Sequence, residues 1–317
     1  MRQKLCKALL LRLKPVRPPP IFTALLAFTP PVPKNSSPYK NLCLNKISVA
    51  KPTISNARIA PTIPTTVIDH NGETQQVEIA GEHALGLYVD KHELITLMTL
   101  GQMPEALAAG WLLSQRLIRN VNELEEIQVD WEAGAVAVYT KNGIAPVLDE
   151  RRTVTSGCGQ GTMFSRLMEE IETVEFCRQP PFSAAALLHL LQLIRQQETI
   201  YKRAGAVHSC ALVAHDGHHA ELLCFVEDIG RHNAADAIAG WMQLNEISGD
   251  GKVFYTTGRL TSEMVIKCAQ MRIPYLVSRS GTTAMGHQVA NAVGLTMLGR
   301  AISQRYLIFS GAKHFNR

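Results

Sequence analysis

The chain has 317 residues, and its 46% hydrophobic and 19% charged content are those of a globular protein large enough for two domains. The net charge of +5 is uneven, because residues 1–60 hold 11 basic and no acidic residues, whereas the remaining chain holds 21 basic and 27 acidic residues. A nucleic-acid-binding domain needs a basic face, so this acidic body argues against nucleic acid as a partner. The apolar runs of the first 60 residues are shorter than the roughly 20 residues that span a bilayer, so we expect no membrane association.

Cysteine usage indicates the compartment. The seven cysteines are an odd number, and no two of them show the C-x-x-C spacing of a zinc or redox motif. This pattern favours free thiols in a reducing compartment, so we expect a cytoplasmic protein. Cys210, Cys224 and Cys268 lie in apolar patterns, and we expect them to be buried as small hydrophobic residues.

The first two segments differ in character. Residues 1–60 are basic and rich in proline, and we expect a disordered extension; a targeting peptide is the less favoured alternative, because prolines interrupt the pattern. Residues 61–150 predict a small α+β domain. It has a hairpin turn at Asn71-Gly72 and a helix that opens at Pro104. That helix is expected to place Leu107, Trp111, Leu112 and Ile118 on one face, and strands are expected at 85–89 and 135–139.

Residues 151–182 are expected to form a mobile cysteine loop. Cys158 stands between two glycines in the segment 153–162, and glycines let a backbone approach a ligand or partner closely. Arg151 and Arg152 precede the loop, and nearby cations favour the reactive thiolate. The alternative is a glycine-rich loop with an incidental free cysteine.

Residues 183–317 predict an α/β domain with a largely parallel sheet, because short apolar strands alternate with helical patterns. Ser183 is the expected N-cap of a helix whose buried face holds Leu187, Leu188, Leu191 and Ile194. A hairpin is expected from strands at 207–214 and 222–226. Further helices are expected at 233–244, 261–271 and 283–293, and further strands at 253–256, 275–277, 295–298 and 306–309.

Polar residues gather where three of these strands run into helices. Each turn carries one arginine, Arg231, Arg259 or Arg279, and ligands of open α/β sheets bind at the carboxyl ends of strands. We therefore expect one anion-binding crevice. Its predicted residues are Arg231, His232, Asn233, Arg259, Ser278, Arg279, Ser280, Arg300 and Arg305, supported by His208, Asp228 and Lys267.

Two alternatives to a ligand site bear on this crevice. Asp228 and Asn233 could form a helix-capping network, but the polar residues of this turn exceed what capping needs, so we favour a site there. His208 is more simply explained as a histidine satisfied inside a strand. Zinc deaminases carry H-x-E followed by P-C-x-x-C, which this chain lacks, so we expect no bound metal.

Several blocks together resemble the formate dehydrogenase accessory sulfurtransferase family (FdhD), over roughly residues 65–310. They are RRTVTSGCGQG at 151–161, GAVHSCALV at 205–213, VEDIGRHNAADAIAG at 226–240, GRLTSEMVIKCAQMRIPYLVSRSGTTA at 258–284 and GLTMLGRAISQR at 294–305. A weaker match is ALAAGWLLSQRLI at 106–118.

The resemblance implies a cytidine-deaminase-like three-layer α/β domain, preceded by the small α+β domain, in a homodimer. It also implies a sulfur carrier that is required for formate dehydrogenase activity. Such a protein accepts sulfur from a cysteine desulfurase as a persulfide, here on Cys158, and passes it to the molybdenum bis-molybdopterin guanine dinucleotide cofactor before insertion. The family's cofactor-binding stretch falls on Arg300, Ala301, Ile302, Ser303, Gln304 and Arg305.

One departure from the family pattern bears on the mechanism. Members commonly carry a second loop cysteine, and this chain has Gly161 there. Either Cys158 works alone, or Cys177 takes the second role. The departure also leaves open a non-catalytic chaperone that binds the molybdenum cofactor without transferring sulfur. A deaminase-like hydrolase is the third hypothesis, and the missing zinc motif counts against it.

Overall fold

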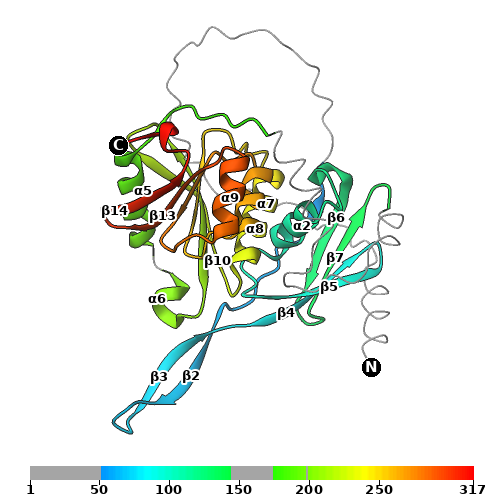
Figure 1. Ribbon diagram of the computed structural model, residues 1–317. Helices are drawn as coiled ribbons and strands as arrows, with labels where there is room; N and C mark the ends of the chain where they lie inside the picture. The colour runs from blue at the N-terminus through cyan, green and yellow to red at the C-terminus, as the bar shows by residue number, and fades with distance from the viewer. Residues whose placement is uncertain (1–50, 144–173, 198) are drawn as a thin grey trace, which may run out of the picture. The chain divides into compact units, whose positions relative to one another are not determined.

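The computed structural model describes residues 51–143, 174–197 and 199–317 (Figure 1). The described residues from Lys51 onward belong to one compact unit. The expected extension 1–60 therefore ends too late, because Thr53–Ile54 form strand β1, which pairs with β6. Cys158 and the expected boundary at residue 150 lie outside the described residues, so both stay predictions.

The first sheet has the strand order β1-β6-β7-β4-β5. Its further strands are β4 (His83–Val89), β5 (His92–Thr99), β6 (Leu124–Asp130) and β7 (Ala135–Thr140). Strand β5 was not expected from the sequence. Asp90 and Lys91 make the β4–β5 turn with φ of 45° and 73°, which is the left-handed region that glycine normally supplies in such a turn.

Helix α2 (Pro104–Ser114) begins at the proline, as expected. It ends before Ile118, because Arg116 adopts a φ of 57° and no helix continues through that conformation. The expected helical position of Ile118 is therefore wrong, although its side chain is buried. Strands β2 (Thr62–Ile68) and β3 (Thr74–Ala80) form the expected hairpin around Asn71-Gly72.

The second sheet has the order β10-β9-β11-β12-β13-β14. Its strands are β9 (His208–His215), β10 (Ala220–Asp228), β11 (Val253–Thr256), β12 (Tyr275–Ser278), β13 (Thr296–Ile302) and β14 (Arg305–Ser310). Only β11–β12 and β12–β13 pair in parallel among these strands. The expectation of a largely parallel sheet is wrong, because hairpins add antiparallel strands on both sides of the parallel centre.

Helices cover both faces of this sheet, as Figure 1 shows. Helix α5 (Ala184–Gln196) packs on one face, while α7 (Arg231–Leu244), α8 (Ser262–Gln270) and α9 (Ala284–Ala292) pack on the other. A separate hydrophobic core lies on each face of this sheet. Side chains alternate between the two faces along β9, so that Ala211 and Val213 face α5, whereas Cys210 and Leu212 face the opposite side. Ser183 caps α5 as expected, since its hydroxyl accepts a hydrogen bond from the Ala186 N–H.

Short elements complete the described fold. Helix α6 (Ile200–Ala204) precedes β9, and strands β8 (Phe182–Ser183) and β15 (Phe315–Asn316) pair in parallel. Two single turns of 3-10 helix span Val121–Glu123 and Ala312–His314.

Helices α2 and α7 cross at very close range. A methyl group built on Gly110 would lie 1.8 Å from the Asp236 carbonyl oxygen, and one on Gly240 would lie 1.9 Å from the Ala106 carbonyl oxygen. Only hydrogen fits at either position, so the two glycines let the helix backbones touch. This crossing fixes α7, whose first turn carries Arg231 and His232, against the helix of the first sheet.

Candidate functional site

The expected crevice lies at one edge of the second sheet. Strands β10, β11, β12 and β13 all end there, and β9 begins there, because His208 pairs with Asp228 and Cys210 pairs with Thr256. The turns at this edge are joined to one another. Thr257 donates its N–H to Ser209 at 2.9 Å, and Arg300 donates its N–H to Ser280 at 2.8 Å. The three polar turns expected from the sequence therefore lie side by side.

Basic side chains from separate elements gather at this edge. We call Arg231, His232, Arg259, Arg279 and His208 the strand-end cluster. The side chain of Arg231 crosses Gly258, where an added methyl group would lie 2.6 Å from the Arg231 Cδ. Burial lowers the pKa of His208 most, and the positive charges of Arg231, Arg259, His232 and Arg279 lower it further. A ring titrating below its usual 6.5 is mostly neutral at neutral pH.

Two members of the strand-end cluster contact side chains of neighbouring elements. The Nε2 of His232 lies 3.1 Å from a carboxylate oxygen of Glu263, and this histidine lowers the pKa of Glu263. The guanidinium of Arg279 lies over the ring of Tyr201, 5.2 Å from its centroid. Cation–π contact of this kind holds a guanidinium in place without cancelling its charge.

Asp228 and Asn233 are used inside the fold. The Asp228 carboxylate accepts hydrogen bonds from the Thr99 hydroxyl, from the Leu100 N–H at 3.2 Å and from the Asn233 amide at 3.0 Å. Asn233 also donates to the Met98 carbonyl at 2.7 Å. Burial raises the pKa of Asp228. These contacts join the end of β5 to the start of α7. The two side chains bind backbone groups, as the alternative to a ligand site expected, but they do not cap α7, whose N-cap is Gly230 without a side-chain hydrogen bond.

Lys267 and Ser278 also have partners within the fold. Lys267 forms a 2.5 Å ion pair with Asp236, whose side chain is 4% exposed, and this pair ties α8 to α7. The hydroxyl of fully buried Ser278 donates to the Gly258 carbonyl at 2.7 Å and accepts the Ser280 N–H at 2.9 Å. These interactions shape the turns, and the predicted contacts of these residues with a ligand stay predictions.

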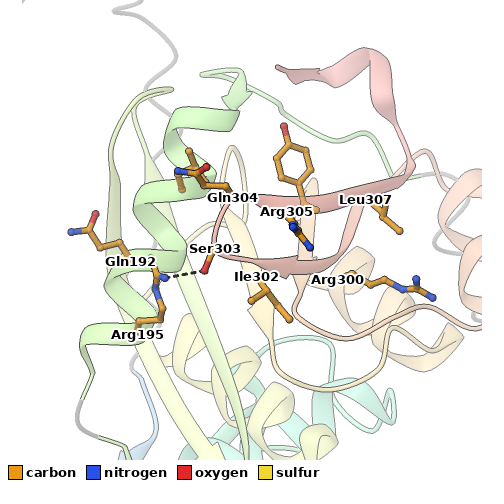
Figure 2. Close-up of a pocket in the computed structure, with 10 residues that line it drawn as sticks. Gln192, Arg195, Arg300, Ile302, Ser303, Gln304, Arg305 and Leu307 are labelled. Atoms are coloured by element: carbon orange, nitrogen blue, oxygen red, sulfur yellow. Dashed lines mark hydrogen bonds between the residues drawn. The ribbon is translucent and has the colours of Figure 1, made fainter.

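The expected stretch Arg300–Arg305 lines a groove of about 1000 Å³ between α5 and the β13–β14 hairpin (Figure 2). We call it the hairpin groove. Arg195 reaches from α5 to the hairpin and donates to the Ser303 hydroxyl at 3.1 Å. Ile302 and Leu307 are 60% and 47% exposed, so the groove combines open apolar surface with guanidinium groups. The lining residues are Leu188, Gln192, Arg195, Arg300, Ile302, Ser303, Gln304, Arg305, Tyr306 and Leu307.

The backbone of the hairpin groove is unusual. Arg300 and Ser303 adopt φ of 51° and 54°, and the β13–β14 register shifts between Gly299 and Ile302. Non-glycine residues in the left-handed region cost free energy and cluster at ligand-binding positions. Ala301 is 1% exposed, and its side chain packs in the sheet core, not in the groove.

Sequence reasoning missed half of the hairpin groove. Leu188 was expected on the buried face of its helix, but it is 37% exposed and lines the groove. Gln192, Arg195 and Tyr306 were not expected at a site either. No signal in one sequence pairs α5 with a hairpin that lies about a hundred residues later, because this contact forms only in the tertiary structure.

The described thiols differ sharply in chemistry. Burial raises the pKa of Cys210 and of Cys224 to about 12, and it also raises the pKa of Cys268, so these three thiols stay protonated. Their expected burial is confirmed. Cys177 is exposed.

Two features are absent from the described residues. Within residues 51–143, 174–197 and 199–317, no three His, Cys, Asp or Glu side chains gather as a metal-ligand set. In the same part of the chain, no helix has the length and apolar character needed to cross a membrane.

Comparison with known proteins identifies the class. The FdhD/NarQ family model matches residues 80–316, and the chain belongs to this family. The match takes in the second sheet, the first sheet except β1, the strand-end cluster and the hairpin groove. The expected resemblance to the formate dehydrogenase accessory family is therefore confirmed.

Particular relatives agree with this assignment. The chain is 29% identical over 233 residues to the sulfur carrier protein FdhD of Wolinella succinogenes, which covers 72% of this chain and 79% of the relative. It is 29% identical over 235 residues to the sulfur carrier protein FdhD of Bacillus subtilis, covering 72% and 87%. A crystal structure of a protein described as a formate dehydrogenase accessory protein from Desulfotalea psychrophila matches with a TM-score of 0.63 at 24% identity, over 80% of this chain and 98% of that one. That match shows the mixed α/β fold.

Proposed function

We propose that this protein is a sulfur carrier required for formate dehydrogenase activity. In this proposal Cys158 accepts sulfur from a cysteine desulfurase as a persulfide, and the sulfur passes to the molybdenum bis-molybdopterin guanine dinucleotide cofactor before insertion. The hairpin groove carries the proposal, because the stretch expected to bind the cofactor lines a groove with three arginines, Arg195, Arg300 and Arg305.

The hairpin groove suits one guanine nucleotide portion of this substrate. Its volume of about 1000 Å³ lies at the upper end of small-molecule sites. Arginine guanidinium groups pair with phosphate oxygens in a bidentate manner. The ring of Tyr306 and the exposed side chains of Ile302 and Leu307 offer apolar surface to a base. In this assignment the arginines bind the pyrophosphate, and the apolar side chains contact the guanine.

The cysteine assignment has support from the other thiols. A persulfide carrier needs an accessible thiol that ionises readily. Cys210, Cys224 and Cys268 are buried with raised pKa values, so they are poor candidates. Cys158 from the sequence and exposed Cys177 remain as the candidates in the family region.

Intact-mass analysis after incubation with a cysteine desulfurase and cysteine tests the proposal. We expect wild type to gain one sulfur atom, reversibly with a reductant, and Cys158→Ala to gain none. Cys177→Ala is the matched control and should gain sulfur as wild type does. No gain in wild type would refute the carrier function, and a gain that disappears only in Cys177→Ala would move the role to Cys177.

A second candidate is a chaperone that binds the molybdenum cofactor without transferring sulfur. Gly161 in place of the second loop cysteine favours it, and neither the hairpin groove nor the strand-end cluster uses a thiol. Formate dehydrogenase maturation in cells separates the two functions. A chaperone predicts full maturation with Cys158→Ala and a loss with Arg231→Ala, whereas the carrier predicts a loss with Cys158→Ala.

The remaining expectations are part of the same proposal. We infer a cytoplasmic homodimer with a cytidine-deaminase-like second domain that contacts a cysteine desulfurase and formate dehydrogenase in turn. The relatives' name, sulfur carrier protein, supports the sulfur-transfer part of this proposal. Light scattering of the purified full chain tests the oligomeric state, and a monomer mass at micromolar concentration would contradict the homodimer.

A further inference from the structure

The tip of the β13–β14 hairpin carries a serine at a position that favours glycine. Ile302 pairs with Arg305, so the turn between the two strands consists of Ser303 and Gln304. Of these two residues only Ser303 has a positive φ, at 54°. A positive φ at the first of two turn residues is the pattern of a type II′ turn, which normally has glycine there. Ser303 therefore holds a backbone conformation that costs free energy for a residue with a side chain.

The side chain of Ser303 contacts helix α5. The guanidinium of Arg195 donates from Nη1 to the Ser303 Oγ at 3.1 Å, and Figure 2 shows this hydrogen bond between the helix and the tip of the hairpin. Glycine would relieve the backbone at position 303, but it has no oxygen in its side chain to accept this bond. The contact with Arg195 is therefore what a serine supplies here and a glycine does not.

We propose that Ser303 is a positioning residue that holds Arg195 in place for a phosphate group bound in the hairpin groove. The inference rests on the proposed function, in which this groove takes a guanine nucleotide portion of the cofactor. Arg195 lies outside the stretch 300–305 that was expected to bind the cofactor, so α5 contributes a ligand-binding residue of its own. Ser303 acts through Arg195 and not by touching the ligand.

The backbone of Arg195 is held as well. Arg195 lies in the last turn of α5, and the Nζ of Lys202 donates to its carbonyl oxygen at 2.9 Å. The same Nζ donates to the carbonyl of Gln197. Lys202 belongs to α6, so these bonds tie the end of α5 to the next helix. With its main chain held by Lys202 and its guanidinium by Ser303, Arg195 has few rotamers to lose when a ligand binds.

One guanidinium group can bind a serine and a phosphate together. It presents five N–H donors in a planar fork, and the bond to Ser303 uses one of them, on Nη1. A second edge of the fork suits a bidentate contact with phosphate oxygens. Arg300 enters the groove from another element, because a methyl group built on Gly281, in the turn before α9, would lie 4.0 Å from the Arg300 Nε. Arginines from α5 and from β13 thus line the groove (Figure 2).

The expected effects on affinity follow from preorganisation. An arginine that is free to move must be immobilised when the ligand binds, and this ordering lowers the affinity. Loss of the Ser303 hydroxyl should therefore weaken nucleotide binding roughly fivefold. Loss of the Arg195 guanidinium removes the phosphate contact itself and should weaken binding at least roughly tenfold.

Calorimetric titration of the full chain with guanosine diphosphate tests the proposal. Ser303→Gly should bind roughly fivefold more weakly, while its Tm stays the same or rises, because glycine adopts the positive φ freely. Ser303→Asn is the conservative variant, since asparagine tolerates the left-handed region and its amide oxygen can accept from Arg195. It should bind as wild type does. Unchanged affinity in Ser303→Gly, or an asparagine variant as weak as the glycine variant, would overturn the proposal.

A double-mutant cycle shows whether Ser303 acts through Arg195. Arg195→Ala and Arg195→Ala/Ser303→Gly should bind guanosine diphosphate equally weakly, because no guanidinium is left to position. An equal loss on Ser303→Gly with and without Arg195 would show that the hydroxyl touches the ligand itself, which overturns the positioning role. Arg203→Ala removes the same charge from α6, where Arg203 pairs with Glu78 outside the groove, and should leave the affinity unchanged.

The test separates this inference from the proposed function. Absence of guanosine diphosphate binding in wild type would overturn both the nucleotide assignment of the hairpin groove and the role of Ser303. Sulfur loading on Cys158 is measured independently by intact mass, so the carrier function can hold when the inference fails. Binding in wild type without coupling between Ser303 and Arg195 would overturn the inference alone.

Discussion

Substitution of Gly110 by alanine puts the packing of α2 on α7 to a decisive test. On an isolated helix this change is favourable by about 1 kcal/mol, because alanine has the higher helix propensity. In the folded chain the added methyl group would lie 1.8 Å from the Asp236 carbonyl oxygen and 2.8 Å from the Gly240 backbone nitrogen. Propensity and packing therefore predict opposite signs.

The size of the expected stability loss depends on which atoms the added methyl group displaces. The methyl group meets backbone atoms of α7, which cannot rotate away as a side chain can, so the two helices must separate locally. Overpacking typically costs about 1–3 kcal/mol, occasionally more, and a backbone collision lies at the upper end. After the gain in propensity, we expect a net loss of about 2 kcal/mol or more in the free energy of unfolding. For a unit of this size that loss lowers Tm by roughly 4–8 °C.

Urea unfolding followed by far-UV circular dichroism measures this change. Gly281→Ala is the control, because the nearest atom to its added methyl group is the Arg300 Nε at 4.0 Å, an ordinary contact. Gly240→Ala should behave as Gly110→Ala does, since its methyl group would lie 1.9 Å from the Ala106 carbonyl oxygen. A Gly110→Ala variant as stable as wild type, or more stable, would show that the helices do not cross as closely as described.

Three further predictions address electrostatics and binding. Lys267→Met leaves the Asp236 carboxylate buried without its cation and should lower the free energy of unfolding in urea by about 3–5 kcal/mol. The double variant Lys267→Met/Asp236→Leu should recover most of this stability. A Lys267→Met variant as stable as wild type would contradict the buried ion pair. Because the folded-state pKa of His208 is lowered, the unfolded chain binds more protons below pH 6.5, so the contribution of His208 to stability is fully present above that pH and is lost as the pH falls. His208→Gln should flatten this part of the stability–pH curve, and an unchanged curve would argue against a lowered pKa. Arg305→Ala should weaken binding of guanosine diphosphate at least about tenfold in calorimetry, because a charge-assisted hydrogen bond to phosphate contributes about 1.5–3 kcal/mol, whereas equal affinity would place the nucleotide outside the hairpin groove.

Local sequence determined most individual elements. The strand at 253–256 is observed at the expected residues, Pro104 begins α2, and Ser183 caps α5 through a hydroxyl contact with an N–H three residues later. Each of these depends on interactions within a few residues, which is why composition and spacing suffice. The three arginine-bearing turns were also found locally, because an apolar strand followed directly by a helical pattern is a signal of short range.

Where local preference was overruled, the reason lies in contacts between distant residues. Asp90 and Lys91 form a left-handed turn without glycine, and α2 ends before Ile118, so one strand was missed and one helix was drawn too long. The sheet is mixed because hairpins flank its parallel centre, and strand direction is a property of connection and pairing, not of residue pattern.

Tertiary structure alone decided what the site residues do. From sequence, Asp228, Asn233 and Lys267 were predicted to take part in or support a ligand site, but their partners Thr99, Met98 and Asp236 lie on other elements. The hairpin groove needed α5 beside β13 and β14, more than a hundred residues apart. Short-range patterns specify which chemical groups the chain carries. Only long-range packing decides which of these groups form contacts within the fold and which remain exposed to a ligand.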